Sequence, residues 1–406
     1  MTTQTSMGRP LAHSYRRSSV NWVALMRVCT VAAFSLCLIV VVLGAYVRLS
    51  DAGLGCPDWP GCYGHLSPNA AAAHMGTAGK AVDGVAGWQG RPLELGKAWR
   101  EMVHRYAAGT LGILIACVAA MSLIRWRERG VPPTLALALV AVVMLQGVLG
   151  MLTVTWQLQP LIVTLHLLFG FTTLSLLWWL VLKLFPEGTD DMISRPDTRL
   201  PGTVPVVARR LALLALVMLA IQISLGGWTS SNYAAIACPD LPTCQSQWWP
   251  QADFRAAYVL WHSREVDYEG GVLDLSARIA IDVIHRVGAM AVSLVLLLAV
   301  GSALRQRENR RARVIAPVVG ALLALQLTIG ISMVLRGFPL WLATAHNAGA
   351  ALLLLALLAL DHSLWSRDAG TSQWGLNVVD RILRLQARAG RGEYRQPQVV
   401  LWRTKP

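Results

Sequence analysis

Long apolar stretches constrain the fold of this chain more than any other feature. Eight of them contain about 20 mostly apolar residues each, enough for a helix to cross the roughly 30 Å hydrocarbon core of a bilayer. Only 14% of the 406 residues are charged, too few to cover the surface of a soluble globule of this length. We therefore predict an all-α integral membrane protein with eight transmembrane helices. The predicted spans are approximately 27–48, 103–124, 134–154, 162–185, 209–229, 279–300, 314–335 and 341–361.

Positive charge is distributed unevenly between the connections. Arginine and lysine gather before the first span, in every second connection and after the last span. Cytoplasmic loops carry such an excess, so both termini are predicted to be cytoplasmic in a bacterial inner membrane. The net charge of +14 is thus interpreted as a topology signal, with lipid as the partner and no nucleic acid. The clusters are Arg9, Arg16 and Arg17; Arg125, Arg127 and Arg129; Lys183, Arg195, Arg199, Arg209 and Arg210; and Arg305, Arg307, Arg310, Arg311 and Arg313.

Several features of the first half recur in the second at nearly constant spacing. The segment CPDWPGC at 56–62 returns as CPDLPTC at 238–244, and the pair His104-Arg105 returns as His285-Arg286. Each half has an even number of spans, which predicts two tandem four-helix bundles related by a parallel repeat. The predicted domains are a basic leader (1–26), an N-terminal half (27–205), a C-terminal half (206–365) and a basic cytoplasmic tail (366–406).

Two pairs of cysteines lie in connections that the charge pattern places outside. Cys56 and Cys62 form one pair, and Cys238 and Cys244 form the other. The outer compartment of a bacterium is oxidising, and a proline-rich turn can bring two nearby sulfurs together. Two local disulfides are the favoured prediction. The alternative is a pair of redox-active thiols at the outer face; the spacing is unusual for zinc.

Four histidines repeat in register near the predicted outer ends of spans. His104 and His166 lie on two spans of the first half that run in the same direction, and His285 and His346 repeat this arrangement in the second. Two imidazoles that face each other across a bundle can bind the iron of one haem from both sides. Each pair is therefore predicted to supply axial haem ligands. A single such histidine would more often be a hydrogen-bonded packing residue.

Polar residues near these histidines have two interpretations each. Glu101 precedes His104 by three residues, and Asp282 precedes His285 likewise, so each carboxylate shares a helix face with its histidine. Each is expected to reach a haem edge or to orient the histidine. Arginine at the outer boundary either pairs with haem propionates or extends to the interface. Glutamine within a span is expected to make hydrogen bonds between helices. The arginines are Arg105 and Arg286, and the glutamines are Gln146 and Gln326.

These residues resemble the haem A synthase family over roughly residues 25–365. The resemblance rests on the segment from Gly44 to Pro60, on Glu101-x-x-His104-Arg105, and on the other three histidines. It implies an enzyme that oxidises a methyl substituent of haem O to a formyl group by successive hydroxylations, giving haem A for terminal oxidases. It also implies haem O synthase and oxidase assembly proteins as partners. The sequence leaves the oligomeric state open, with a homo-oligomer among the alternatives.

The resemblance assigns roles residue by residue. His104, His166 and Arg105 would bind the substrate haem O in the N-terminal half. Glu101 would assist the chemistry there. His285, His346 and Arg286 would hold a resident haem b in the C-terminal half, and the four cysteines would form the two disulfides of bacterial members. Asp282 departs from the family pattern, because it is a second carboxylate in register with Glu101.

Other functions are compatible with the same residues. A quinol-linked electron-transfer cytochrome would hold two permanent haem b groups and modify nothing. A haem carrier or oxidase assembly factor would bind haem without catalysis. A transporter is a weaker alternative, because the halves lack matching interruptions in their spans.

Overall fold

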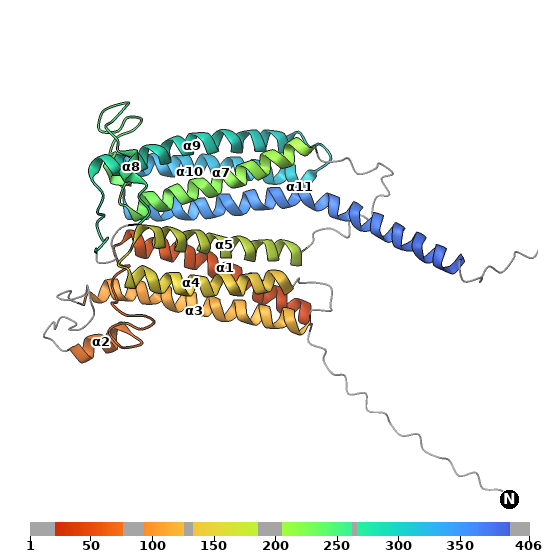
Figure 1. Cartoon of the computed structure of the whole chain (residues 1–406), viewed down its shortest axis with the longest axis horizontal. Helices are drawn as coiled ribbons and strands as arrows, with labels where there is room; N and C mark the ends of the chain where they lie inside the picture. Colours follow the sequence, from red (N-terminus) through yellow and green to blue (C-terminus); the bar gives the residue numbers. More distant parts are fainter. Residues whose placement is uncertain (1–20, 76–92, 126–132, 186–204, 262–265, 390–406) are drawn as a thin grey trace, which may run out of the picture.

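The structure is a computed structural model that describes residues 21–75, 93–125, 133–185, 205–261 and 266–389 (Figure 1). Most of the predicted basic leader, including Arg9, Arg16 and Arg17, lies outside the described residues. So do Arg127, Arg129, Arg195, Arg199 and the end of the predicted tail. The orientation expected from these clusters stays a prediction.

All eight predicted spans are helices that are long and apolar enough to cross a membrane. No strand occurs in the described part of the chain, where isolated bridges alone pair extended residues. The long helices are α1 (Trp22–Leu49), α3 (Leu95–Ile124), α4 (Pro133–Thr155), α5 (Pro160–Leu184), α7 (Val206–Ser231), α9 (Leu275–Leu304), α10 (Arg310–Leu335) and α11 (Leu340–Ala389). Short helices α2 (Pro68–Met75), η1 (Ala235–Ala237) and α8 (Phe254–Ala257) occupy the connections.

Local sequence signals account for several helix starts. The Asn21 side chain accepts a hydrogen bond from the backbone N–H of Ala24 at 3.1 Å and caps α1. Asn309 caps α10 in the same way through Ala312. Proline opens α5, where its missing N–H is harmless. These signals place the helix ends within a few residues of the apolar boundaries.

Two helices extend beyond the apolar stretches that identified them. Helix α3 begins at Leu95, before the predicted start at residue 103, because a polar turn can continue a helix outside the hydrocarbon layer. Glu101 and His104 therefore share one continuous helix. The backbone of α11 stays helical to Ala389, past the domain boundary predicted at residue 365.

The long helices form two groups of four. Helix α1 packs against α3 and α5, and α4 packs against the same two helices, so that α3 and α5 lie diagonally opposite. In the second group α7 and α10 both pack against α9 and α11, which makes α9 and α11 the diagonal pair. Figure 1 shows the two groups side by side, with α2 and α8 at the same end. The first group contains the four helices expected in 27–205, and the second contains the four expected in 206–365.

One continuous apolar core joins both groups. Alanines spaced along α7 and α10 are fully buried and let neighbouring backbones approach closely, as at Ala215 and Ala316. Leucines on α5 and α11 fill the remaining space, as at Leu177 and Leu357. Large apolar side chains on the outside, such as Met144, are widely exposed, as expected of a surface that faces lipid.

Candidate functional site

The four repeated histidines lie on the diagonal helices of the two groups. His104 on α3 and His166 on α5 are close enough for a charge on one to act on the other, and the same holds for His285 on α9 and His346 on α11. All four side chains are partly buried. Each group thus presents two imidazoles from opposite sides of its interior.

A glycine from a neighbouring helix lies against each imidazole. A Cβ atom added to Gly44 would lie 3.0 Å from Cε1 of His104, and one added to Gly226 would lie 3.2 Å from Cε1 of His285. Such distances leave almost no room for a side chain. The other two pairs are Gly150 with His166 at 3.4 Å and Gly330 with His346 at 3.1 Å. In the sequence Gly44 and Gly226, and likewise Gly150 and Gly330, match at nearly the spacing of the other repeated features, but the spacing does not show that they meet the histidines.

Both predicted disulfides are present in the connections. Cys56 is bonded to Cys62, with Cα atoms 4.8 Å apart, and Cys238 is bonded to Cys244, with Cα atoms 4.6 Å apart. Backbone hydrogen bonds between Cys62 and His65 close the first loop, and the second loop repeats them with Cys244 and Gln247. The two loops are built alike, as their sequences suggested.

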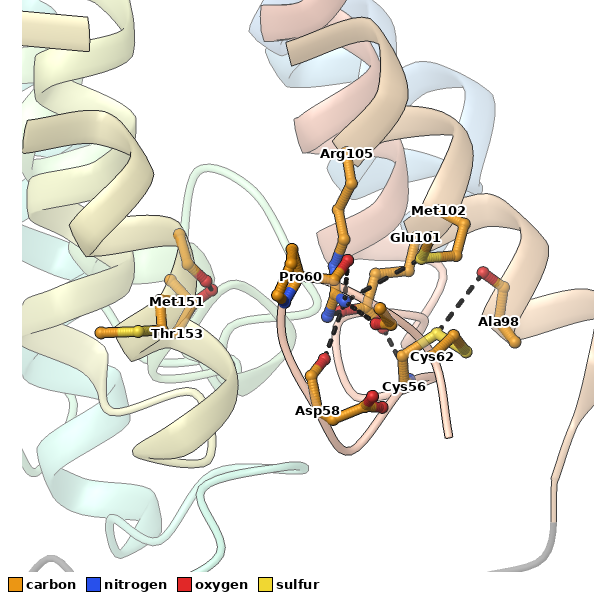
Figure 2. A network of polar contacts seen from close by, with 12 residues as sticks. Cys56, Asp58, Pro60, Cys62, Ala98, Glu101, Met102, Arg105, Met151 and Thr153 are labelled. Carbon is orange, nitrogen blue, oxygen red and sulfur yellow. Dashed lines mark hydrogen bonds and ion pairs between the residues drawn. A yellow bond between two sulfur atoms is a disulfide. The ribbon is translucent and has the colours of Figure 1, made fainter. Parts of the chain in front are cut away.

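Arg105 points from α3 into the first disulfide loop (Figure 2). Its guanidinium donates to the backbone oxygens of Asp58 at 2.8 Å and Gly61 at 2.5 Å, and it pairs with the buried Glu101. Glu101 also accepts a hydrogen bond from the backbone N–H of Cys56 at 2.8 Å. Helix α3 is therefore tied to the loop through a buried ion pair.

Arg286 ties α9 to the second loop in a similar way. It donates to the backbone oxygens of Cys238 at 2.7 Å and of Asp240 and Thr243 at 2.9 Å each. Its Nε atom lies 2.7 Å from Asp282, which has no other polar partner in the described structure. Glu101 differs from Asp282, because its longer side chain also reaches a loop N–H.

The sequence did not predict these contacts for the arginines and carboxylates. The guanidinium groups bind loop carbonyl oxygens, and each carboxylate pairs with its arginine. The physical reason is the loop itself. Each disulfide closes a short loop, and a nearby arginine supplies several donors at once to its backbone oxygens. The expected roles of these residues toward a haem stay predictions.

Comparison with known proteins assigns the chain to a family. Residues 27–358 match the family model COX15-CtaA, described as a cytochrome oxidase assembly protein. The chain belongs to this family. Its relatives include a "Heme A synthase" of Shewanella oneidensis, 41% identical over 336 residues that cover 83% of this chain and 96% of the relative.

More distant relatives carry the same name. The "Heme A synthase" of Rhizorhabdus wittichii is 28% identical over 376 residues, which cover 88% of this chain and 97% of that protein. The one from Halalkalibacterium halodurans is 25% identical over 325 residues, covering 79% and 90%. With eight apolar helices and this family membership, the chain is a multi-pass membrane protein.

The histidines of this COX15-CtaA family member fit axial ligation of a haem. The Nδ1 atoms of His104, His166 and His346 are buried without a hydrogen-bond partner among the described residues. Unpaired buried imidazole nitrogens are costly unless a ligand satisfies the ring. Two such rings from opposite helices are the donor set that a planar porphyrin with bound iron takes.

Glutamines link helices beside the histidines. Gln146 donates to the backbone oxygen of His166 at 3.0 Å, and Gln326 donates to that of His346 at 3.0 Å, which confirms the expected bonds between helices. Gln222 on α7 was not among the predicted site residues, yet its Nε2 lies 3.0 Å from Nδ1 of His285. A signal was available, because Gln222 lies one helix turn before the repeated Gly226.

Proposed function

We propose that this chain is a haem A synthase, an enzyme that oxidises a methyl substituent of haem O to a formyl group by successive hydroxylations. The observation that carries the proposal is the pair of imidazoles in each bundle, with a glycine against every ring. The relatives named "Heme A synthase" cover most of the chain and support the choice of reaction. The product, haem A, would serve terminal oxidases.

In this proposal each bundle has its own role. His104 and His166 hold haem O as the substrate in the N-terminal half, and His285 and His346 hold a resident haem b in the C-terminal half. Bound haem supplies redox chemistry for oxidising a C–H bond, which no side chain supplies alone. The protein binds and orients both groups through ring nitrogens and excludes water with its apolar helices.

Glu101 is the proposed catalytic carboxylate. It lies one turn from His104 on the same face of α3, is buried, and is fixed by the backbone N–H of Cys56 and by Arg105. A fixed carboxylate can hold or pass a proton at its Oε atoms or stabilise positive charge that develops nearby. Asp282 is ion-paired with Arg286 and takes no catalytic role in the proposal.

The proposed placement in the membrane follows the charge pattern. Both termini would be cytoplasmic, and both disulfide loops would face the outside with the ends of the helices that carry the histidines. Haem O is large and apolar, so the lipid-facing surface is the proposed route of entry. Haem O synthase, oxidase assembly proteins and a second copy of the chain are the proposed partners.

The reaction is tested by expressing the chain together with a source of haem O and separating the extracted haems by chromatography with mass detection. Hydroxylated and formylated products are expected with the wild type, and their yield should fall in Glu101→Gln but not in the matched Asp282→Asn. Recovery of unaltered haem O from a well-folded wild type would refute the proposal. Two haem b groups with no change to haem O would point to an electron-transfer cytochrome.

The roles of the two halves are tested by visible spectra of purified variants. His285→Ala or His346→Ala should remove the haem b bands, whereas His104→Ala should leave them. If the bands disappeared in the His104 variant alone, the assignment of the halves would have to be reversed.

A further inference from the structure

The two histidine pairs differ in what holds their rings. In the C-terminal half, Nε2 of Gln222 lies 3.0 Å from Nδ1 of His285 and also donates to the backbone oxygen of His285 at 2.9 Å. Nε2 of Gln326 lies 3.3 Å from Nε2 of His346 and donates to the backbone oxygen of that residue at 3.0 Å. Both rings of this half therefore have an amide at a ring nitrogen.

Each glutamine depends on a glycine one turn after the histidine. A Cβ atom added to Gly288 would lie 2.3 Å from Oε1 of Gln222, and one added to Gly349 would lie 2.3 Å from Oε1 of Gln326. Any side chain at these positions would collide with the amide. The lack of a side chain at these glycines therefore leaves space for each glutamine to reach its imidazole ring.

The N-terminal half lacks this arrangement. At the matching positions Val40 replaces Gln222, and Ala107 replaces Gly288. Gln146 matches Gln326 but bonds only to the backbone oxygen of His166, and Phe169 takes the position of Gly349. The Nδ1 atoms of His104, His166 and His346 all lack a hydrogen-bond partner in the described part of the chain, but His346 has Gln326 at its Nε2 atom. The ring of His104 meets the backbone of Val40, and neither ring of the N-terminal half has a side-chain amide at a nitrogen.

We propose that Gln222 and Gln326 are positioning residues that lock the imidazoles of His285 and His346, so that the C-terminal half retains its haem while the N-terminal half lets its haem exchange. A hydrogen bond at the second nitrogen fixes the tautomer and orientation of a ligating ring. The amide can donate or, turned over, accept, and Oε1 of Gln222 is buried without a partner in the described residues. The inference rests on the proposed function, since it presumes one resident and one exchanging haem.

The test measures how fast haem leaves the C-terminal half. Full-length protein carrying His104→Ala, which confines bound haem b to that half, is mixed with excess apomyoglobin, and transfer is followed by absorbance. Adding Gln222→Leu or Gln326→Leu should speed transfer about 10-fold or more and shift the haem midpoint potential. The matched Gln146→Leu should leave both values unchanged, and Gln222→Glu, which keeps an acceptor, should restore slow transfer.

A second set of variants introduces the glutamine and its glycine into the N-terminal half. In a His285→Ala background, Val40→Gln with Ala107→Gly should slow haem loss from the N-terminal half, whereas Val40→Leu with Ala107→Gly should not. If the rate of haem transfer to apomyoglobin were unchanged in both Gln222→Leu and Gln326→Leu, the inference would be overturned and the proposed function would stay intact. A parent protein with no haem b would instead overturn the proposed function.

Discussion

At the scale of single residues, the candidate sites depend on four glycines, where the lack of a side chain leaves space for an imidazole ring. Each of the four proposed ligand histidines faces a glycine, and a methyl group there would stand 3.0–3.4 Å from the ring. Contacts that short force a neighbour to move, and an imidazole that binds iron, as proposed, would have little freedom to do so. The glycines are therefore as specific a part of the site as the histidines.

Gly226→Ala tests this requirement. Its new Cβ atom would press on Cε1 of His285, so we expect a displaced ring and a clear loss of haem b per protein, measured by absorbance after purification. Gly301→Ala on α9 is the control, because nothing lies within 4 Å of its added Cβ. The control should keep its haem, and its free energy of unfolding should rise by up to about 1 kcal/mol, because alanine favours the helix more than glycine does. Equal haem content in both variants would contradict the steric argument.

The disulfide loop at 238–244 should give a pH-dependent stability. Hydrogen bonds to the Asp240 carboxylate, first from the Thr243 hydroxyl and then from the N–H groups of Ser246 and Gln245, hold the pKa of Asp240 below its ordinary value. A lowered folded-state pKa stabilises the fold above the unfolded pKa of about 4 and loses that effect as pH falls through the folded value. Asp240→Asn should therefore lower the melting temperature at pH 7, and the difference from wild type should shrink below about pH 4. A difference that is constant with pH would exclude this origin.

At the scale of elements, each disulfide loop is held against the helix that carries a proposed ligand histidine, His104 on α3 or His285 on α9. The disulfide of each loop is buried against apolar side chains of the helix, Ala98 and Met102 on α3 or Ile279 on α9, and polar contacts add to this packing. Arg105 and Arg286 supply these contacts, each directly after a histidine. The loop and the histidine are thus held by consecutive residues of one helix.

Arg105→Ala should destabilise the protein by about 3–5 kcal/mol, because it leaves the Glu101 carboxylate buried without its cation. Unfolding in detergent micelles, followed by circular dichroism, measures the effect. Lys97→Ala on the same helix breaks an exposed pair with Glu94 at 3.0 Å and should cost no more than about 1 kcal/mol. Glu101→Gln combined with Arg105→Ala should recover part of the lost free energy of unfolding. If the losses of the two single variants simply added in the double variant, the result would argue against a buried ion pair.

At the scale of the whole molecule, the two bundles meet through α1, α5, α7 and α11. Arg48 at the end of α1 donates to the backbone oxygen of Ser230 on α7 at 2.8 Å and stacks over the Tyr233 ring at 4.2 Å. Asp51 completes the cluster by accepting from the Tyr233 hydroxyl at 3.2 Å. Arg48 and Ser230 each lie one helix turn beyond the glycine that meets a histidine, so this cluster joins the bundles near both sites.

Arg48→Ala should cost about 2 kcal/mol of stability through the lost charged hydrogen bond and ring contact. Tyr233→Ala should cost less, and the double variant should lose less than the sum of the two, with a coupling of at least about 0.5 kcal/mol. Unfolding midpoints of the three variants test this. Additive losses would mean that the two residues act independently across the interface.

Several features of the fold and site followed from the sequence, for identifiable reasons. Spans are visible because a bilayer requires a minimum length of apolar residues, which makes the eight helices nearly independent of context. The loop disulfides followed from local spacing and compartment. The role of Arg105 did not follow from the sequence. Its partners are backbone oxygens of a loop more than 40 residues away, and every residue type has the same backbone oxygen, so no sequence motif marks them.

The sequence by itself determined the eight membrane-spanning helices, the two disulfides and the four repeated histidines, because each depends on residue type and local spacing. Only the tertiary structure decided which glycine meets which imidazole, that the arginines hold loops, and that Gln222 reaches His285. These contacts are set by how helices rotate and slide against one another. That packing depends on the shape of the whole core, so it appears only once all eight helices are assembled.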